Sequence, residues 1–508
     1  MARTKHVFTV VAVLAVASSA ACTVLLDRDD TQCSTDADCK ALSAGSVCRD
    51  AVCILASDAG NGPDGCFAGT PTTNDELLNA CAPQVECVPF DNCKELGICD
   101  ATLPPTSDPP GGTSTAASDA GSPATQRCTD LAARDGARIV YATGSSNFPP
   151  FLAGFAPVLA ASDPRHAVVW QTSSSCEGVD RVFNSSAALR TMKEQPGRVT
   201  QYYDATGTAV PCLLDGEVAV DIGESDVYAT SCAQRLGYSP ANPVGTPIVG
   251  EYLGPIMAMV FAVPASSTKT ALSAEAARSV FGQTPTATAR LGYDDPSQLF
   301  IRSDSTATNQ IMSRAIFVEP KKWWGVDKST ASNMTTQLKQ VPSQLAEKTI
   351  GVLSSDFADR ERGNLTTLAF QARGQSCAYY TDSTKFAKDK RNVRDGHYAM
   401  WGPLHFYTRL EGNGPNEAAG AFAVRFSVPQ LDQPLIDAIA KTSTTPLCAM
   451  KVTRDDEMGP MRPFDPSFHC GCYFDSLVGG ASSCTRCAGP QDCPSSQPAC
   501  NYGYCETR

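Results

Sequence analysis

The stretch ARIVYATGSSNFPP, residues 137–150, indicates how the largest part of the chain folds. Its first half, residues 137–142, is rich in β-branched and aromatic side chains and predicts a buried strand. The polar turn Thr143-Gly-Ser-Ser-Asn147 follows directly. Residues 149–159 then suit a helix, because the fixed φ of proline fits a first helical turn. The stretch therefore predicts one strand–polar turn–helix unit.

Similar apolar runs recur downstream, at residues 167–171, 218–222, 255–263 and 298–301. Polar turns follow most of these runs, and stretches of helical character follow the turns. Strand, polar turn and helix in repeated order argue for parallel sheets in an α/β domain. In such sheets ligands bind at the carboxyl ends of the strands, where loops lead into helix N-termini.

Four polar turns are the candidate ligand-binding elements: Thr143-Gly-Ser-Ser-Asn-Phe148, Thr172-Ser-Ser-Ser-Cys-Glu-Gly178, Ser225-Asp226 and Arg302-Ser-Asp-Ser-Thr-Ala-Thr308. Each supplies small and hydroxyl side chains at a helix mouth, where free backbone N–H groups and the helix dipole attract anions. Arg302 adds a guanidinium that can form a forked pair of hydrogen bonds with a tetrahedral oxyanion. A single Ser-Asp turn is more often a routine N-cap, so only the four turns together predict an anion site.

Two carboxylates, Asp226 and Asp304, lie among these turns. A carboxylate accepts hydrogen bonds but cannot donate them, so it repels a fully ionised oxyanion. It accepts the proton that phosphate retains at neutral pH and that sulfate lacks. These two residues therefore predict selection of phosphate against sulfate.

Residues 1–21 have the features of an export signal, with basic residues before the uncharged apolar run at 7–21. A membrane span needs about 20 apolar residues, so this run is short for one. Ser-Ala-Ala directly before Cys22 is what a bacterial lipoprotein peptidase cleaves, although Ser19 stands where Leu is usual. We expect a lipid at Cys22; the alternative is an ordinary signal peptide cut near Ala21.

The cysteine count supports export. The chain has 23 cysteines, and setting Cys22 aside leaves 22, an even number that can all pair (23 − 1). Disulfides on this scale indicate an oxidising compartment. Zinc sites are the alternative, but most spacings differ from the paired CxxC of zinc ribbons. We expect a location in the bacterial cell envelope, on the periplasmic side or at the cell surface.

Charge and motifs limit the other classes of function. The net charge is −12 and no basic block is present, so nucleic acid is not an expected partner. The chain lacks a Gly-x-Ser-x-Gly elbow and a His-Glu-x-x-His motif. The run His469-Cys-Gly-Cys472 suits metal, but paired cysteines are expected there. We expect no enzymatic activity, no catalytic residue, no cofactor and no metal.

Composition predicts five segments: a signal peptide at 1–21, a Cys-rich module at 22–100, a flexible linker rich in Pro, Gly, Ser and Thr at 101–127, a binding domain at 128–447 and a second Cys-rich module at 448–508. The two Cys-rich ends share a repeat, Cys33-x5-Cys39-x8-Cys48-x4-Cys53 and Cys487-x5-Cys493-x6-Cys500-x4-Cys505. Each repeat has enough cysteines for two internal bridges, which chains below about 40 residues need in order to fold. The modules serve as surface contacts or as protease-resistant spacers.

At the four turns the chain resembles the phosphate-binding protein family, the periplasmic receptors of phosphate ABC transporters. Ser146-Asn-Phe-Pro149 stands where the family has Gly-Ala-Thr-Phe-Pro, and Gly223-Glu-Ser-Asp226 where it has Gly-Ala-Ser-Asp. Arg302-Ser-Asp-Ser-Thr-Ala-Thr308 is similar to the family's Arg-x-Asp-Gly-Ser-Gly-Thr. The resemblance covers roughly residues 136–445 and departs from the family pattern at 147, 176, 305 and 307.

The resemblance implies a two-lobed α/β clamp of the type II periplasmic-binding-protein kind, flanked here by disulfide-rich modules, with chain crossovers near 250 and 370 as the hinge. The implied phosphate-binding residues are Asn147, Phe148, Ser175, Ser225, Asp226, Arg302, Asp304, Thr306 and Thr308. At the second turn, either Ser175 contacts the ligand or Cys176 replaces it. A disulfide at Cys176, which would fix this loop, is a further alternative.

The implied partners are inorganic phosphate or a related oxyanion, an ABC permease, and the membrane through a lipid at Cys22. The alternative is a cell-surface scaffold, adhesin or sensor that keeps the clamp without serving transport.

Overall fold

The computed structural model describes residues 46–49, 52–55, 66–82, 84–100, 102–109, 124–196, 198–284, 291–412, 414–480 and 484–508. The chain divides into two compact units, Met1–Thr70 and Pro71–Arg508. In the first unit, β1 (Ser46–Arg49) and β2 (Val52–Leu55) form an antiparallel pair. The predicted signal peptide and lipidation site Cys22 lie outside the described residues. Among the helices in the described ranges, none is long and apolar enough to cross a membrane.

The second unit contains two lobes. In the first lobe, β5 (His166–Thr172) and β10 (Ile222–Ser225) lie parallel to β4 (Arg138–Gly144), one on each side. The crossing strand β19 (Trp401–Glu411) pairs antiparallel with β10. The order across this part of the sheet is therefore β5, β4, β10 and then the crossing strand β19, so the first of the three parallel strands in the chain lies between the other two. Two further antiparallel strands extend the β5 edge, β7 (Thr200–Tyr203) and β8 (Ala209–Pro211).

The second lobe repeats this order. The strand β13 (Leu299–Ile301) lies between β14 (Val326–Asp327) and β15 (Ile350–Ser354), all parallel. The other crossing strand, β11 (Val249–Pro264), pairs antiparallel with β15. One continuous sheet path joins the lobes, in the order β14-β13-β15-β11-β19-β10-β4-β5-β7-β8. The predicted α/β fold, a two-lobed clamp of the type II kind, is confirmed.

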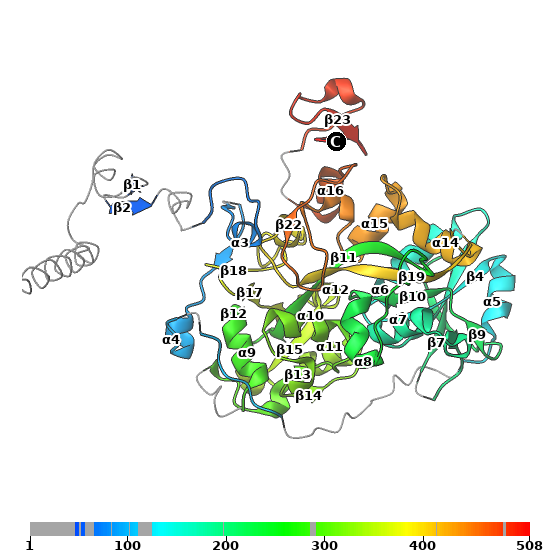
Figure 1. Cartoon of the computed structure of the whole chain (residues 1–508), viewed down its shortest axis with the longest axis horizontal. Helices are drawn as coiled ribbons and strands as arrows, with labels where there is room; N and C mark the ends of the chain where they lie inside the picture. The colour runs from blue at the N-terminus through cyan, green and yellow to red at the C-terminus, as the bar shows by residue number, and fades with distance from the viewer. Residues whose placement is uncertain are drawn as a thin grey trace, which may run out of the picture. The chain divides into compact units, whose positions relative to one another are not determined.

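The strands β11 and β19 connect the lobes and run through the middle of the second unit (Figure 1). The first half of β11 pairs with β19 and its second half with β15, with a register shift between Leu253 and Ile256. The crossover predicted near 250 is therefore present. The one predicted near 370 is wrong, because β16 (Leu365–Thr367) and β17 (Ala369–Gln371) still belong to the second lobe.

Two predicted strands differ from the structure. Within residues 218–222, β9 (Val218–Ala219) pairs outside the main sheet with β6 (Thr191–Met192), and the parallel strand β10 begins only at Ile222. Between them, the Asp221 carboxylate accepts a hydrogen bond from the Tyr141 N–H at 2.8 Å, and the Asp221 N–H donates to the Tyr141 carbonyl at 2.9 Å. The predicted strand at 255–263 is the second half of β11, and it is antiparallel.

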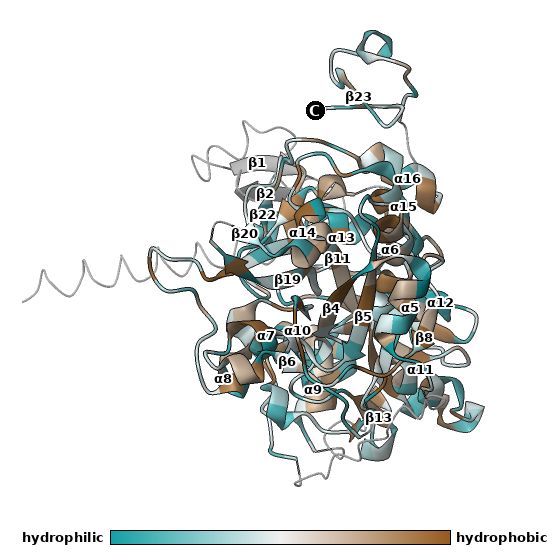
Figure 2. Ribbon diagram, turned by 90° about the vertical axis from the view of Figure 1, so that its right-hand side faces the viewer, coloured by the Kyte–Doolittle hydropathy of each residue, from teal (hydrophilic) through white to brown (hydrophobic). Residues whose placement is uncertain are grey.

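Helices follow the parallel strands and cover both faces of the sheet: α6 (Pro149–Ala160), α7 (Ser175–Phe183), α10 (Ala307–Ala315), α11 (Ala331–Lys339) and α12 (Ser355–Arg360). The other short elements of the two lobes are α5 (Cys128–Asp135), α8 (Ala233–Leu236), α9 (Ala274–Gly282), α13 (Arg391–Asp395), α14 (Glu417–Ala423), α15 (Gln433–Lys441), β12 (Ala271–Ser273), β18 (Ala378–Tyr379) and β20 (Gly414–Pro415). Hydrophobic residues concentrate on β4, β5 and β11, between the helix layers (Figure 2).

The Cys-dense segment before the lobes packs on the second lobe. It contains α3 (Asn74–Leu78), α4 (Asn92–Leu96) and β3 (Cys87–Val88), and β3 is the edge strand of the sheet β12-β17-β18-β3. Cys87 is bridged to Cys377, so this segment is joined covalently to the second lobe. Residues 102–109 of the predicted linker also lie on this lobe, where the Ser107 N–H donates to the Gly282 carbonyl at 2.7 Å.

The C-terminal segment contains α16 (Gly471–Val478) and the antiparallel pairs β21 (Val452–Thr453) with β22 (Arg462–Pro463) and β23 (Ala499–Asn501) with β24 (Tyr504–Glu506). Its disulfides are Cys448–Cys470, Cys472–Cys484, Cys487–Cys500 and Cys493–Cys505. The last two confirm that the second cysteine repeat closes two internal bridges. The cysteines of His469-Cys-Gly-Cys472 are likewise paired in disulfides.

A loop between Cys448 and Cys470 packs on the strand that returns between the lobes. The Arg454 guanidinium lies 4.2 Å from the centre of the Trp401 ring and donates to the Ala399 carbonyl at 3.0 Å. From the first lobe, the Tyr228 hydroxyl donates to the Arg454 carbonyl at 2.8 Å. The C-terminal segment is therefore anchored at the hinge.

Candidate functional site

Four helix N-termini meet at a cleft between the lobes, with a volume of about 590 Å³. The first lobe contributes Ser145, Ser146 and residues 172–175, which precede or begin α6 and α7. The second lobe contributes residues before or at the starts of α10 and α11: Arg302, Ser303, Ser305, Thr306, Ser329, Thr330 and Ser332. Two of the predicted turns thus lie on one lobe and one on the other, and all three line the same cleft.

Arg302 is the buried arginine among the three that line this cleft. Its side chain is only 2% exposed, and Nη2 donates to the Ser146 hydroxyl at 2.9 Å. Among the described residues, its Nε and Nη1 groups have no hydrogen-bond partner. Burial lowers the pKa of Arg302 to about 10, with Asp327 and Asp226 opposing this change. A buried cation with two unused donor groups is costly unless an anion completes it.

Two hydrogen bonds join the lobes across the cleft. One is the bond from Arg302 of the second lobe to Ser146 of the first. The other runs from Asn147 Nδ2 to the Thr308 hydroxyl at 3.3 Å. The structure therefore has the lobes in contact, as expected for the closed state of a clamp.

Asp226 lies behind the cleft wall and holds the first turn in place. Its Oδ2 accepts hydrogen bonds from the Ser145 hydroxyl at 2.6 Å and from Asn147 Nδ2 at 2.9 Å. The side chain is 1% exposed and does not line the cleft. Its observed role is to orient Ser145 and Asn147.

The second turn settles the choice between Ser175 and Cys176. Cys176 is bridged to Cys232, so its sulfur is not available as a ligand contact. Ser175 is the first residue of α7 and lines the cleft, and its hydroxyl accepts a weak hydrogen bond from the Asp226 N–H at 3.4 Å. The disulfide ties the first turn of α7 to the 3₁₀ helix η2 (Ala229–Cys232).

Besides Asn147, Asp226 and Thr308, three more predicted site residues lie outside the cleft lining. The Phe148 ring packs in the apolar core against Trp170 and Phe406, and its N–H already donates to the Ser145 carbonyl. The Ser225 hydroxyl donates to the Val227 carbonyl at 2.7 Å. Asp304 is not part of the lining, and its carbonyl accepts from Gln310 at 2.5 Å.

Thr306 and Thr308 begin α10. Thr306 is its N-cap and lines the cleft, whereas Thr308 is fully buried behind the wall and accepts from Asn147.

Several residues of the cleft are absent from the sequence prediction. Ser145 and Ser146 belong to the first turn, but spacing alone does not show which of its side chains face the ligand. The turn at 329–332 follows the two-residue strand β14, too short to give an apolar run. It continues the same pattern of hydroxyls before a helix, and that pattern is the signal by which it could be found.

An ion pair lies at one side of the cleft. Arg198 donates to both carboxylate oxygens of Glu177, each at 2.7 Å, and Arg181 also contacts Glu177 at 3.0 Å. Burial raises the pKa of Glu177, but the arginines outweigh it and hold that pKa below its usual value. Because Arg198 is already neutralised and Arg235 is exposed to water, Arg302 is the cleft arginine that needs a counter-ion.

Comparisons with known proteins give structural likeness only. No protein-family model and no curated protein matches the chain. The solved structure of a phosphate ABC transporter substrate-binding protein from Clostridium perfringens, with bound phosphate, is 11% identical, with a TM-score of 0.41, and the match covers 61% of this chain and 100% of that one.

An ABC-type phosphate transport receptor from Vibrio cholerae is 11% identical, with a TM-score of 0.39 and coverage of 60% and 99%. A human phosphate-binding apolipoprotein is 14% identical, with a TM-score of 0.39 and coverage of 61% and 91%. Identities and TM-scores this low give no basis for carrying a ligand over to this chain.

Proposed function

We propose that this protein is an exported solute-binding lipoprotein that captures inorganic phosphate in the cleft between its lobes. The observation that carries the proposal is Arg302, buried at 2% exposure with two donor groups that have no partner within the described part of the chain. Leaving charged donors buried and unpaired costs more than an ordinary lost hydrogen bond. A tetrahedral oxyanion beside Ser146 supplies both the charge and the acceptors that Arg302 needs.

The surroundings of Arg302 favour a small oxyanion over a larger organic ligand at this point. The lining there consists of hydroxyl side chains and helix N-termini. Ser145, Ser303 and Thr306 contribute hydroxyl groups and lie in the turns that lead into the helices. Hydroxyls donate along fixed directions, and helix N-termini add unpaired backbone N–H groups. Together with one guanidinium these donors match an ion that has acceptor oxygens on every side.

The two carboxylates that were expected from the sequence to select phosphate against sulfate do not contact the cleft. Neither Asp226 nor Asp304 lines the cleft in this closed arrangement. Any preference then comes from the negative charge of Asp226 behind the wall, which opposes the dianion sulfate more than the monoanion H₂PO₄⁻, a form that phosphate partly has at neutral pH. Sulfate is therefore the comparison ligand in the test.

Export and anchoring belong to the same proposal. The signal-like residues 1–21, the lipidation sequence before Cys22 and the many disulfides fit a protein of the cell envelope. An anchored clamp of this kind delivers phosphate to an ABC permease. A sensor or scaffold that keeps the clamp is the second candidate, favoured by the C-terminal loop on the hinge, which a minimal clamp does not need.

Isothermal titration calorimetry of the exported full-length protein with phosphate and sulfate tests the binding proposal. The expected result is binding of phosphate, and an affinity at least about 100-fold lower in Arg302→Met, since two charged hydrogen bonds are lost. Arg235→Met is the matched control, because Arg235 is exposed at the edge of the same cleft and water screens its charge.

An absence of heat with phosphate in the parent protein would overturn the function. If the parent binds and Arg302→Met binds equally well, the site is wrong although the function stands. Equal losses in Arg302→Met and Arg235→Met would show a general charge effect in place of a specific site.

A further inference from the structure

The cleft is larger than the anion that Arg302 requires. Its volume of about 590 Å³ falls in the range of about 300–1,000 Å³ that is usual for sites holding organic molecules. A phosphate ion displaces roughly two or three water molecules, at about 30 Å³ each. The lobes are already joined by the Arg302–Ser146 and Asn147–Thr308 hydrogen bonds, so this volume belongs to the closed arrangement. Most of the cleft is therefore left for a part of the ligand other than a phosphate group.

The additional space lies on the side of Arg302 away from the hinge. From the crossing strands β19 and β11, the sheet runs outward through β10, β4, β5, β7 and β8 in the first lobe and through β15, β13 and β14 in the second. Ser146 follows β4 and Arg302 follows β13, and the lining continues outward to Gln201 on β7, Pro211 on β8 and Thr330 after β14. Neighbouring strands are about 4.8 Å apart, so β8 lies roughly 14 Å from β4.

This outer part of the cleft is lined by polar side chains that suit a hydroxylated ligand. Hydroxyl and amide groups can both donate and accept hydrogen bonds, as the hydroxyl groups of glycerol or a sugar do. Among the described residues that line the whole cleft, only Val199 and Pro211 are apolar. The residues that form this outer subsite include Thr172, Glu177, Arg198, Gln201, Thr330 and Ser332.

Two of these side chains are held in place by buried aromatic residues. The Thr172 hydroxyl accepts a hydrogen bond from Trp170 Nε1 at 2.9 Å, which leaves its own O–H to donate to a ligand. The Gln201 side-chain oxygen accepts from the Tyr203 hydroxyl at 3.4 Å, which leaves the Nε2 group as a donor. Because Trp170 and Tyr203 are buried, they fix where these donors lie.

The charges of the outer subsite favour a neutral group there over a second anion. Arg198 donates to both carboxylate oxygens of Glu177, each at 2.7 Å, so the pair carries no net charge. Arg235, at the edge of the cleft, is exposed and its charge is screened by water. A second phosphate group would therefore find no buried counter-ion in this part of the cleft.

We propose that the cleft binds a phosphomonoester of a hydroxylated carbon skeleton, such as a glycerol or sugar phosphate. The phosphate group lies at Arg302 and the skeleton lies in the outer subsite. The inference rests on the proposed function and names a larger class of ligand for the same site. An ester keeps three charged oxygens for Arg302, Ser146 and the helix N-termini, and its fourth oxygen carries the skeleton toward the outer subsite.

Isothermal titration of the exported full-length protein with four ligands at one pH tests this inference. The ligands are inorganic phosphate, methyl phosphate, glycerol 3-phosphate and ribose 5-phosphate. Methyl phosphate is the reference, because it is a monoester of the same charge without hydroxyl groups. We expect at least one of the two hydroxylated esters to bind about tenfold more tightly than methyl phosphate, since it gains two or more neutral hydrogen bonds.

The variants Gln201→Leu and Thr172→Val test the position of the carbon skeleton. Each removes one donor of the outer subsite and keeps a similar side-chain volume. Each should weaken the hydroxylated ester about fivefold and leave methyl phosphate and inorganic phosphate within about twofold of the parent. Gln337→Leu is the matched control, because Gln337 is exposed on α11 and does not line the cleft, so the affinity for every ligand should be unchanged.

Equal affinities for methyl phosphate and both hydroxylated esters, with inorganic phosphate still bound, would overturn the outer subsite alone. Tighter binding of a hydroxylated ester that persists unchanged in Gln201→Leu and Thr172→Val would likewise overturn it, because the skeleton would then lie elsewhere. A parallel loss of methyl phosphate in these variants would show that the two residues support the anion site in place of an outer subsite. If the parent binds none of the four ligands, the proposed function fails together with the inference.

Discussion

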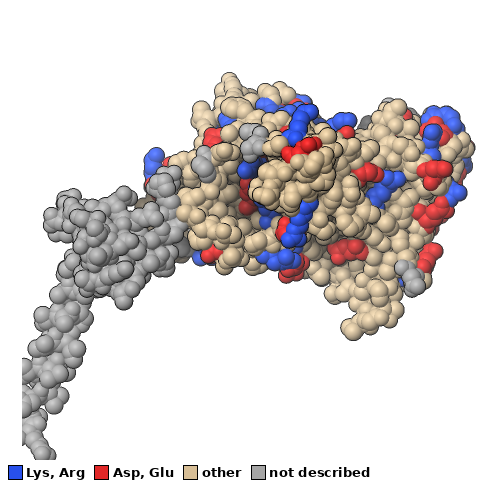
Figure 3. Space-filling model, turned by 90° about the horizontal axis from the view of Figure 1, so that it is seen from above, with Lys and Arg blue, Asp and Glu red and all other residues tan. Residues whose placement is uncertain are grey.

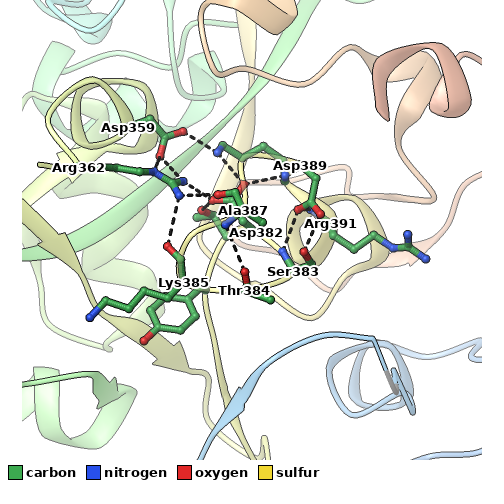
Figure 4. A network of polar contacts seen from close by, with 12 residues as sticks. Asp359, Arg362, Asp382, Ser383, Thr384, Lys385, Ala387, Asp389 and Arg391 are labelled. Atoms are coloured by element: carbon green, nitrogen blue, oxygen red, sulfur yellow. Dashed lines mark hydrogen bonds and ion pairs between the residues drawn. The ribbon is translucent and has the colours of Figure 1, made fainter. Parts of the chain in front are cut away.

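A buried ion network behind α12 offers a stability prediction that does not depend on the ligand. Lys390 is 2% exposed, and its Nζ donates to Asp359 at 2.6 Å and to Asp382 at 2.9 Å. Arg362 contacts the same two carboxylates, at 2.5 and 2.7 Å (Figure 4). Two cations and two carboxylates therefore balance inside the second lobe.

Lys390→Met removes one cation and leaves two buried carboxylates with one arginine. Removing one partner of a buried ion pair costs about 3–5 kcal/mol, because the remaining charge has lost its compensation. The upper part of this range is expected, since Lys390 contacts both carboxylates and Met fills a similar volume without replacing the charge. Urea unfolding with the disulfides intact, followed by tryptophan fluorescence, measures the loss.

The double variant Lys390→Met/Asp382→Asn tests the reason for that loss. It restores the balance of charge, because Asp359 and Arg362 remain as a pair, so it should be more stable than Lys390→Met by about 1–3 kcal/mol. Lys388→Met, two residues earlier and exposed, should stay within about 0.5 kcal/mol of the parent. A loss below about 1 kcal/mol in Lys390→Met, or a double variant less stable than the single, would refute the reasoning.

Two further predictions concern the cleft and its supports. In Asp356→Asn, the free energy of unfolding relative to the parent should increase between pH 4 and 7. Burial raises the pKa of Asp356 from 3.8 to about 6, so the parent loses up to about 3 kcal/mol of stability over this range and the variant does not. Urea unfolding at several pH values measures the difference, and a difference that does not vary with pH would contradict the prediction. In Cys176→Ser/Cys232→Ser, loss of a bridge with a sequence separation of 56 should lower stability by about 4 kcal/mol and weaken phosphate binding through α7, whereas Cys487→Ser/Cys500→Ser, remote from the cleft, should lower stability without changing the affinity.

The sequence predicted which turns form the cleft better than it predicted which side chains of those turns face the ligand. The turns after β4, β5 and β13 were predicted because apolar run, polar turn and helix are local signals. Which side chain of a turn faces the ligand depends on packing. Phe148 was expected in the site, but its ring is the most apolar of the turn and packs into the core. Ser225 was expected there too, but its hydroxyl is used by the backbone two residues later.

Features that join distant parts of the chain, such as the return crossover and the disulfide pairs, could not be predicted from the sequence for a different reason. The return crossover was placed near 370, because nothing in the local pattern separates β16 and β17 from a strand that changes lobes. The disulfide partners depend on the tertiary fold, so the bridges Cys87–Cys377 and Cys176–Cys232 could not be derived from spacing. Glu224 stood in the quoted turn, but only the structure shows that its carboxylate accepts a hydrogen bond from the Ser145 N–H.

The face of the molecule shown in Figure 3 adds little to the choice of partner. On the face shown in Figure 3, basic and acidic side chains of the described residues lie side by side, without a broad area of one sign. This agrees with the absence of a basic block in a chain of net charge −12. Long-range attraction of an anion is therefore weak, and capture depends on the local donors of the cleft.

The Cys-rich C-terminal segment is better explained as part of the clamp than as a spacer. Its helix α16 packs on α15 of the first lobe, where the Tyr473 hydroxyl donates to Asp437 at 2.7 Å. The same helix carries Asp475, which pairs with Arg394 of α13, in the region joined to the second lobe by the Lys390 network. One rigid, disulfide-held element thus contacts both lobes.

Opening the cleft moves these two contacts relative to each other unless α16 moves as well. The loop that carries Arg454 adds a third contact, on Trp401 at the hinge itself. A clamp held at both lobes and at the hinge opens through a smaller angle than one connected by β11 and β19 alone, because each degree of rotation must be absorbed by these contacts too. A small opening would suit the proposed ligand phosphate, and it would keep Arg302 close to its interlobe partner Ser146.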